Sequence, residues 1–337
     1  MTAAPETLAA ALYRDAPTYA RERERVFARA WLLLGHESQL REPGAVVAAT
    51  IADYPVLAVK SDKGIRAFHN VCRHRAGPLA PDGESQCAGS LTCAYHGWRY
   101  TLDGRLQVAR DFGPAEGFDP RAYSLIPLKC ESWNGFVFVN MHEDAPPLAE
   151  TVEPLARRAK NFAFDRFRYT GASSHILRCQ WKTYVENYLE GYHIPLVHPE
   201  LSAEIEPGSY SVEVDDPLTV HHAKPRNGSS VDGMWGFLWP NLAINVYADG
   251  VMMERVAPVS HDRTRLDYLY FFDAGASRER FDAAMTLSDA TTAQDIWICE
   301  AVQRNLDAGI YDKGRLSPKH EQGVAWFQNR VRTALGN

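Results

Sequence analysis

Two short stretches, Cys72-Arg73-His74 and Cys93-Ala94-Tyr95-His96-Gly97-Trp98, decide how this sequence is interpreted. Each contributes one cysteine and one histidine, so together they can bring two thiolates and two imidazoles to a common point. This donor set suits a [2Fe–2S] cluster in which histidines hold one of the two irons. The imidazoles raise the cluster potential to roughly −150 to +300 mV, from about −400 mV for an all-cysteine cluster. The sequence therefore predicts electron transfer, with Cys72, His74, Cys93 and His96 as the cluster ligands.

Structural zinc is the alternative for these four residues, since Cys2His2 also describes many zinc fingers. Zinc fingers more often pair cysteine with cysteine and histidine with histidine, whereas here each segment carries one of each. Turn residues follow both halves, Arg75-Ala76-Gly77-Pro78 in the first and Gly97-Trp98 in the second. Two loops that close over an inorganic core fit this pattern, so the cluster is the favoured interpretation.

Composition limits the class of protein. A length of 337 residues suggests two domains, and 45% hydrophobic with 23% charged residues is ordinary for a globular chain. A net charge of −6 and the lack of a basic run give no sign of nucleic-acid binding. The first twenty residues lack the basic start of a signal peptide, and no membrane span is expected. The other four cysteines have no disulfide-like spacing, so we expect reduced thiols and a cytoplasmic location.

Hydrophobic periodicity divides the chain near Pro147. Period-two runs such as Val46–Thr50, Val56–Lys60 and Phe136–Asn140 predict a small all-β unit that carries both cluster segments. Beyond Pro147, helices and strands mix, which predicts an α+β domain whose antiparallel sheet encloses a cavity against a long helix. No GxGxxG or Walker A loop is present, so no nucleotide site is expected. The helices are expected near 18–30, 148–162, 181–193, 278–307 and 318–335, and the later strands at 210–214, 218–223, 242–247, 252–258 and 265–272.

A second constellation lies in the helix predicted at 181–193. Glu190 and His193 are three residues apart, which predicts that they share one helical face. Pro195 is expected to end this helix, so that His198 can turn back toward His193. A polar face on a buried helix is costly unless its groups are paired or bind a metal.

Two histidines and a distant carboxylate form the facial triad of non-haem Fe(II) oxygenases. Asp295, on the long helix predicted at 278–307, is the best third ligand, and Asp289 and Glu300 are weaker candidates. Because His-x4-His alone is a weak signal, the interpretation depends on the cluster, which needs an electron acceptor.

This sequence resembles the α subunit of Rieske non-haem iron oxygenases, the aromatic-ring-hydroxylating dioxygenase family. The resemblance is carried by the two cysteine–histidine segments, the segment from Glu186 to His198, and Asp295. The resemblance implies an α+β fold: a Rieske all-β [2Fe–2S] domain followed by a helix-grip catalytic domain with an antiparallel sheet. It further implies an N-terminal helical segment, 1–35, that packs on the catalytic domain, a Rieske domain at 36–147 and a catalytic domain at 148–337. A homotrimer is also implied, in which the cluster of one subunit reduces the iron of its neighbour.

Site residues follow from the resemblance position by position. It implies that His193, His198 and Asp295 are the ligands of a mononuclear Fe(II). Glu190 matches a bridging carboxylate that contacts His193 and the His96 of the adjacent subunit, and Asn187 matches a residue near the iron. Most ring-hydroxylating relatives carry aspartate where this chain has Glu190. Relatives that act on quaternary ammonium compounds often have glutamate.

The implied activity is that of a terminal oxygenase, which uses O2 and electrons from NAD(P)H through a separate reductase, with or without a ferredoxin. We expect monooxygenation or oxidative demethylation of a small aromatic or betaine-type substrate, with cis-dihydroxylation of an aromatic ring as the alternative. Two other classes stay open: a Rieske electron-transfer protein, and a zinc-stabilised binding module. The residues Trp235–Asn241 are expected to precede a strand, and His221 is expected at a solvated strand position.

Overall fold

The computed structural model describes residues 4–226, 233–247, 249–273 and 275–336. Its contacts divide the chain into two compact units, one of residues 28–149 and one of residues 1–27 with 150–337. Both units contain antiparallel sheets, and the predicted α+β fold class is confirmed. The boundaries expected at 35/36 and 147/148 stay a prediction. The first of them falls at the end of β1 (Leu32–His36), a strand of the 28–149 unit.

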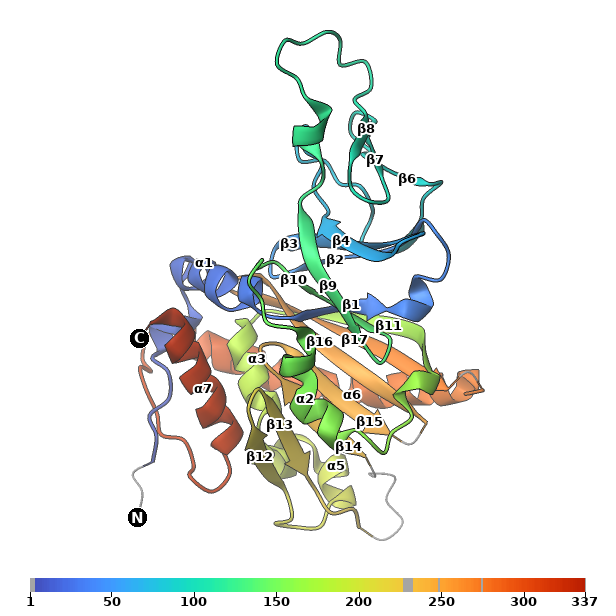
Figure 1. Cartoon of the computed structure of the whole chain (residues 1–337). Helices are drawn as coiled ribbons and strands as arrows, with labels where there is room; N and C mark the ends of the chain where they lie inside the picture. The colour runs from blue at the N-terminus through green and yellow to red at the C-terminus, as the bar shows by residue number, and fades with distance from the viewer. Residues whose placement is uncertain (1–3, 227–232, 248, 274, 337) are drawn as a thin grey trace. The chain divides into compact units, whose positions relative to one another are not determined.

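The unit of residues 28–149 is built on a seven-stranded antiparallel sheet in the order β1-β10-β9-β4-β3-β2-β5, beside a small sheet β6-β7-β8 (Figure 1). Two-residue turns with positive φ, Ala52-Asp53 and Asn134-Gly135, join neighbouring strands of the large sheet. Such turns match the twist of a hairpin and fix its register. The strands are β1 (Leu32–His36), β2 (Ala45–Ile51), β3 (Tyr54–Ser61), β4 (Gly64–His69), β5 (Gly83–Gln86), β6 (Ser90–Thr92), β7 (Arg99–Thr101), β8 (Leu106–Val108), β9 (Pro127–Trp133) and β10 (Phe136–Asn140).

The core of this unit includes the two cysteines of the predicted cluster. Cys72 and Cys93 are buried in one hydrophobic group with Trp98, Tyr100 and side chains of β2, β3 and β4. The segments that carry the predicted ligands are therefore attached to the sheet by their own cysteines and by adjacent aromatic rings. Close packing of this kind limits the movement of the loops.

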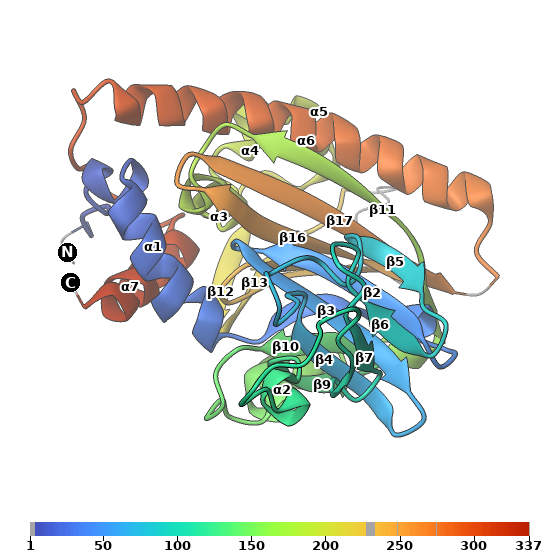
Figure 2. The same ribbon diagram turned by 90° about the horizontal axis from the view of Figure 1, so that it is seen from above.

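The unit of residues 1–27 and 150–337 contains the second sheet, seven antiparallel strands in the order β11-β17-β16-β15-β14-β13-β12. In Figure 2 the long helix α6 crosses this sheet. The strands are β11 (Phe167–Leu177), β12 (Ser211–Asp215), β13 (Leu218–His222), β14 (Met234–Leu238), β15 (Leu242–Tyr247), β16 (Gly250–Ser260) and β17 (Arg263–Asp273). The helices are α1 (Ala16–Arg25), α2 (Leu148–Arg158, which begins two residues before this unit), α3 (Trp181–Tyr188), α4 (Ile194–Val197), α5 (Pro199–Glu204), α6 (Arg278–Asp307) and α7 (Gln322–Leu335).

Helices α3 and α6 cover one face of this sheet. The Tyr268 hydroxyl of β17 contacts the Thr292 hydroxyl of α6 at 2.6 Å and the Tyr184 hydroxyl of α3 at 3.2 Å. Ser288 of α6 donates to the sulfur of Met252 on β16 at 3.1 Å. Alternate residues of a strand point to one face. Met252 and Glu254, two residues further along β16, therefore both face these helices.

A buried ion pair attaches the N-terminal helix α1 to α3. Glu22 and Lys182 both have fully buried side chains and form a short contact. The other carboxylate oxygen of Glu22 accepts from Gln180 and from the Trp181 indole, each at 2.8 Å. Lys182 also donates to the Leu12 carbonyl at 2.9 Å. Because every charge in this group has a partner, the start of α3 is held at a defined position.

Over the residues that the structure describes, no helix combines the length and the apolar character needed to cross a membrane.

Candidate functional site

The two segments predicted to hold a cluster form loops with the same pattern of backbone hydrogen bonds. In the first, the Cys72 N–H donates to the Gly77 carbonyl at 2.9 Å, and the Ala76 N–H donates back to Cys72 at 3.0 Å. In the second, the Cys93 N–H donates to Trp98 at 2.8 Å, and the Gly97 N–H donates to Cys93 at 3.0 Å. Each loop therefore closes on its own cysteine through two backbone hydrogen bonds.

Side-chain contacts bring the two loops together. The rings of His74 and His96 lie 4.7 Å apart, and His74 stacks on Trp98 at 4.8 Å with an interplanar angle of 8°. Cys72 and Cys93 are each 2% exposed. The Nδ1 atom of His74 is buried without a hydrogen-bond partner among the described residues. A buried imidazole nitrogen in that state fits a metal ligand, because an unpaired polar atom is otherwise costly.

The spacing of these donors favours a two-metal group over one zinc ion. A tetrahedral zinc ion with bonds of about 2.0–2.3 Å needs donor atoms within roughly 4 Å of one another. In the described part of the chain, the only group with three donor atoms within 4.8 Å is formed by other residues, His193, His198 and Asp295. Cys72, His74, Cys93 and His96 form no such group among the described residues, and a cluster of two bridged irons does not require one.

His193, His198 and Asp295 meet in the unit of residues 1–27 and 150–337. Their donor atoms all lie within 4.8 Å of one another, and none of the three side chains is freely exposed. His198 Nε2 is 2.9 Å from Asp295 Oδ1, and His193 Nε2 is 3.7 Å from the same oxygen. The two rings are 5.1 Å apart at 75°. Two imidazole nitrogens and one carboxylate oxygen thus face a common point, which is the donor set of a facial triad.

Outer hydrogen bonds fix which nitrogen of each histidine faces that point. His193 Nδ1 donates to Glu190 Oε1 at 2.6 Å, and His198 Nδ1 donates to Gln294 Oε1 at 2.6 Å. With a proton on Nδ1, the lone pair of each ring sits on Nε2. Burial lowers the pKa of His198, but Asp295 and Gln294 outweigh burial and raise that pKa above its ordinary value. His198 Nε2 and Asp295 Oδ1 are both hydrogen-bond acceptors. A shared cation, either a proton or a metal ion, stabilises two acceptors at this distance.

Asn187 completes the surroundings of Asp295. Its side-chain amide donates to Asp295 Oδ1 at 2.7 Å. Asn187 lies on α3 and Asp295 on α6, so this bond ties together the two helices that contribute to the site.

Two local expectations about this site are wrong. The helix α3 ends at Tyr188, so Glu190 and His193 do not share a helical face. They meet because Glu190 Oε2 accepts the backbone N–H groups of Tyr192 and His193, which folds the chain into a tight turn. Pro195 does not end a helix either: it lies in the first turn of α4, where its missing N–H costs nothing. That short helix separates His193 from His198 by one turn.

The weaker candidates for the third ligand lie elsewhere. Asp289 contacts His175 Nε2 at 3.1 Å, and Glu300 accepts the backbone N–H of Arg178 at 2.9 Å. Neither belongs to the group of three donor atoms. Of the three carboxylates considered on α6, the structure brings only Asp295 to the two histidines.

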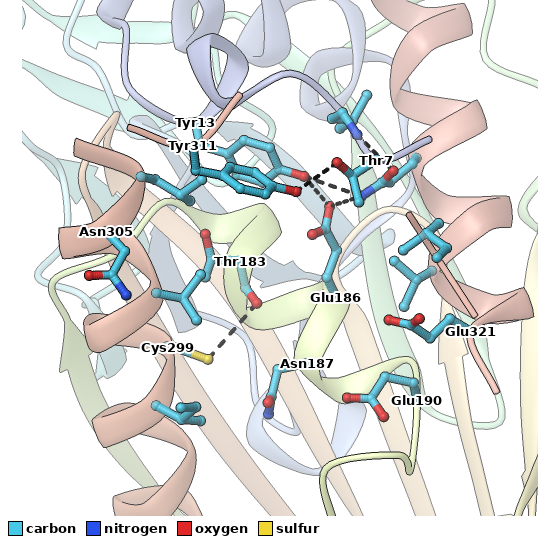
Figure 3. A pocket seen from close by; sticks show the side chains of 17 residues that line it. Thr7, Tyr13, Thr183, Glu186, Asn187, Glu190, Cys299, Asn305, Tyr311 and Glu321 are labelled. Carbon is cyan, nitrogen blue, oxygen red and sulfur yellow. Dashed lines mark hydrogen bonds between the residues drawn. The ribbon is translucent and has the colours of Figure 1, made fainter. Parts of the chain in front are cut away.

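A cavity of about 490 Å³ is lined by two residues that contact this site, Asn187 and Glu190 (Figure 3). Glu186, Asn187 and Glu190 line it from α3 and the turn that follows, and Tyr13 and Tyr311 line it from other segments. Burial raises the pKa of Glu186 to about 7, against the opposing effect of Tyr13, whose hydroxyl donates to it at 2.5 Å. Glu190 thus contacts His193 on one side and lines the cavity on the other.

Two sequence expectations about the sheet are also corrected. The segment Trp235–Asn241 does precede the strand β15, but its first residues, Trp235 among them, lie within β14, which was not expected. His221 is 6% exposed rather than solvated, and its Nδ1 accepts from the Tyr210 hydroxyl at 2.6 Å. Burial lowers the pKa of His221 to about 3, so this ring is neutral. The sequence held no signal for this, because Leu218-Thr219-Val220-His221 alternates apolar and polar residues, yet all four are buried.

Comparison with known proteins agrees with this picture. The Rieske [2Fe-2S] domain family matches residues 30–119, and the ring hydroxylating alpha subunit (catalytic domain) family matches residues 164–233 and 213–337. The carnitine monooxygenase oxygenase subunit of Escherichia coli (strain K12) is 30% identical over 347 residues, with 96% of this chain and 92% of that protein covered. The chloroplastic choline monooxygenase of Beta vulgaris is 28% identical, with coverage of 94% and 74%.

Solved structures give the same result. The quaternary ammonium Rieske monooxygenase CntA in complex with L-carnitine superposes with a TM-score of 0.88 at 26% identity, covering 98% of this chain and 96% of that one. Naphthalene 1,2-dioxygenase with bound indole has a TM-score of 0.81 at 18% identity, covering 98% and 92%, which is a likeness of fold.

Fold and donor sets together define an iron–sulfur oxidoreductase with a separate oxygenase domain. The chain belongs to the family of Rieske non-haem iron oxygenase α subunits. As a terminal oxygenase of this family it is an enzyme, which excludes the two other classes considered from the sequence. Membership implies a [2Fe–2S] cluster, a mononuclear iron and a separate reductase.

Proposed function

We propose that this protein is the monooxygenase component of a multicomponent system and acts on a quaternary ammonium substrate. The observation that carries the proposal is the group of His193, His198 and Asp295, whose donor atoms lie within 4.8 Å of one another. The relatives named as choline and carnitine monooxygenases support the substrate class. Cis-dihydroxylation of an aromatic ring is the alternative reaction, and only the remote fold likeness to naphthalene 1,2-dioxygenase favours it.

The predicted site residues would form two separate sets of ligands, one for each metal centre. His193, His198 and Asp295 would hold the mononuclear Fe(II), and three protein ligands would leave open positions. Cys72 and Cys93 would hold one iron of the cluster, and His74 and His96 the other. When bound, the cluster supplies single electrons and the mononuclear iron supplies the chemistry of O2 activation.

The protein's own contribution to this site is orientation. Glu190 and Gln294 hold the two imidazole rings by their Nδ1–H groups, so that each Nε2 lone pair faces the same point. Asn187 donates to one oxygen of Asp295, which limits rotation of that carboxylate. These three bonds come from α3, α6 and the turn between α3 and α4. Movement of either helix would therefore disturb the donor geometry.

We further propose that the functional form is a homotrimer, and that electrons reach the iron from the cluster of a neighbouring copy through Glu190. Glu190 contacts His193 and also lines the 490 Å³ cavity, so a group from another chain could approach it there. The crystal structure of a related quaternary ammonium Rieske monooxygenase has been described as giving insight into inter-subunit electron transfer. The electrons would come from NAD(P)H through a separate reductase, with or without a ferredoxin.

The test is substrate-dependent oxygenation by chemically reduced holoenzyme. Choline, carnitine and a set of aromatic acids are each supplied to anaerobically reduced protein, O2 is added, and products are identified by mass spectrometry. We expect an oxygenated product from a trimethylammonium compound. An Asp295→Ala control should lose the mononuclear iron and the product, while the visible spectrum of the cluster persists. A cis-diol formed from an aromatic acid, with no product from the ammonium compounds, would contradict the proposal.

A further inference from the structure

Glu254 is a buried carboxyl group on the sheet face that α3 and α6 cover. It lies on β16 directly opposite Tyr268 of β17 and is 2% exposed. The Tyr268 hydroxyl contacts Tyr184 of α3 and Thr292 of α6. Thr292 is one helical turn before Asp295, so Glu254 faces the same region as the proposed iron ligands.

Among the described residues, no cation of the protein neutralises this group. Glu254 takes part in no ion pair with any described residue, and its Oε1 atom is buried without a hydrogen-bond partner there. Other buried carboxylates of the chain are paired: Glu22 with Lys182, and Asp267 with Arg255. A buried carboxyl without a cation is costly, and an apolar side chain would fill the position at lower cost. We therefore expect a bound ligand, and not the protein, to supply the positive charge that Glu254 lacks.

The surroundings of Glu254 fit a cationic ligand. Burial, and then the charge of Glu254, raise the pKa values of Tyr184, Tyr188 and Tyr268 above the ordinary tyrosine value, so these rings stay neutral. Burial raises the pKa of Glu254 itself to about 7 against the opposing hydrogen bonds of Tyr184 and Tyr268, and the negative charge of Asp295 adds to the rise. Two carboxyl groups and several aromatic rings therefore share this region. A tetraalkylammonium group is attracted by ring faces and by negative charge and needs no hydrogen-bond acceptor.

We propose that Glu254 recognises the cationic group of the substrate and selects charged over neutral substrates of the same shape. This inference rests on the proposed function, since it assigns a residue to the substrate of that oxygenase. Tyr184 and Tyr268 hold the carboxyl in place, and their rings supply the surface on which the methyl groups of the cation pack. Glu254 acts on binding and specificity; it is not assigned a part in the oxidation.

The experiment compares a cation with its neutral isostere. Choline and 3,3-dimethylbutan-1-ol have the same shape, but carbon replaces nitrogen in the second. Binding of both, and of tetramethylammonium and carnitine, is measured by calorimetry on anaerobic, iron-loaded protein. We expect wild-type protein to bind choline or carnitine more tightly than the neutral alcohol. Glu254→Gln should weaken binding of the cation by about thirtyfold or more, as expected when a buried charge pair loses one member, and leave the neutral alcohol within about twofold.

Glu186→Gln is the matched control. Glu186 is also a buried carboxyl with a pKa raised to about 7, but it faces Tyr13 and Gln328 on the opposite side of α3 from Tyr184. It should leave cation binding unchanged. Iron content and unfolding temperature verify that both variants are folded.

The outcomes separate the two proposals. Equal binding of choline by wild type and Glu254→Gln, or no binding of any cationic probe by wild type, would overturn the role of Glu254. Binding that follows the expected pattern while no oxygenated product forms would instead count against the proposed function and leave the recognition role supported.

Discussion

Gln294 provides a direct test of how the proposed iron site is built. This residue precedes Asp295 on α6, and its Oε1 accepts the Nδ1–H of His198 at 2.6 Å. His198 is 3% exposed, so its Nδ1–H has little access to solvent, although Gln294 itself lies at an exposed position of α6. Replacing Gln294 by methionine keeps the length of the side chain and removes the acceptor. We expect His198 to lose its fixed orientation while the cluster in the other unit is unaffected.

The size of the effect follows from the role of the lost bond. Loss of an outer hydrogen bond to a metal-bound histidine typically lowers metal affinity about 10- to 100-fold. That range equals about 1.4 to 2.7 kcal/mol of binding free energy. Because the buried Nδ1–H would also be left unpaired, we expect the upper part of the range.

The assay is an iron titration. Protein prepared without oxygen is equilibrated with graded chelator, and mononuclear iron is taken as total iron minus the two irons of the cluster, which is counted by its visible absorbance. Gln294→Glu retains an acceptor and should hold iron at least as well as wild type. Gln303→Met, a change at a buried glutamine elsewhere on α6, should have no effect. Unchanged iron affinity in Gln294→Met would refute the reasoning that this bond orients His198.

Three further predictions concern stability and the cluster. Lys182→Met should cost about 3–5 kcal/mol in urea unfolding because it leaves Glu22 buried without its cation, and adding Glu22→Gln should recover most of that loss; an equally unstable double variant would contradict the ion-pair explanation. The folded pKa of Glu186, about 7, lies above its ordinary value near 4.5, so its stabilising effect is complete below that value and is lost as pH rises through 7. Glu186→Gln should therefore be more stable than wild type at pH 8 and lose this advantage toward pH 5; an advantage independent of pH would exclude titration of Glu186. Gly77→Ala should reduce bound cluster, measured as acid-labile sulfide, because its Cβ would lie 2.8 Å from the Cys93 sulfur; full sulfide content would show that the loop can adapt.

The sequence was most informative where function depends on short local motifs. Cys72, His74, Cys93 and His96 lie in two loops that are closed by hydrogen bonds within each loop, so their spacing alone indicated the geometry. Asp295 was preferred to Asp289 and Glu300 on the same helix, and the resemblance to a family implied the same residue. The structure brings it to the two histidines and leaves Asp289 and Glu300 with other partners.

Strands were missed where the hydrophobic pattern is weak or where burial extends to both faces. In β11 (Phe167–Leu177) the half-buried positions include Gly171, Ser173 and His175, so the polar and apolar residues do not alternate. In β1 (Leu32–His36) every residue is buried, and a continuous apolar run cannot be assigned by period. For β9, the Asn134-Gly135 turn that joins it to β10 was an available signal that was not used.

The end of α3 could not be predicted for a different reason. Leu189-Glu190-Gly191-Tyr192-His193 has no proline and continues the helical pattern, yet the helix stops at Tyr188. A β-carbon on Gly191 would clash with the ring of Tyr210, so the turn depends on a residue of another segment. Tertiary contacts of this kind override local propensity.

The turn after α3 affects how electron transfer in this enzyme can be studied. One oxygen of Glu190 holds the His193 ring, while the other accepts two backbone N–H groups that give the loop its shape. A shorter or neutral residue there would change the proposed coordination geometry and the proposed route between the redox centres together. Slow turnover in such variants would therefore mix two defects, and only structures or spectra of the iron site, recorded beside the rates, can separate them.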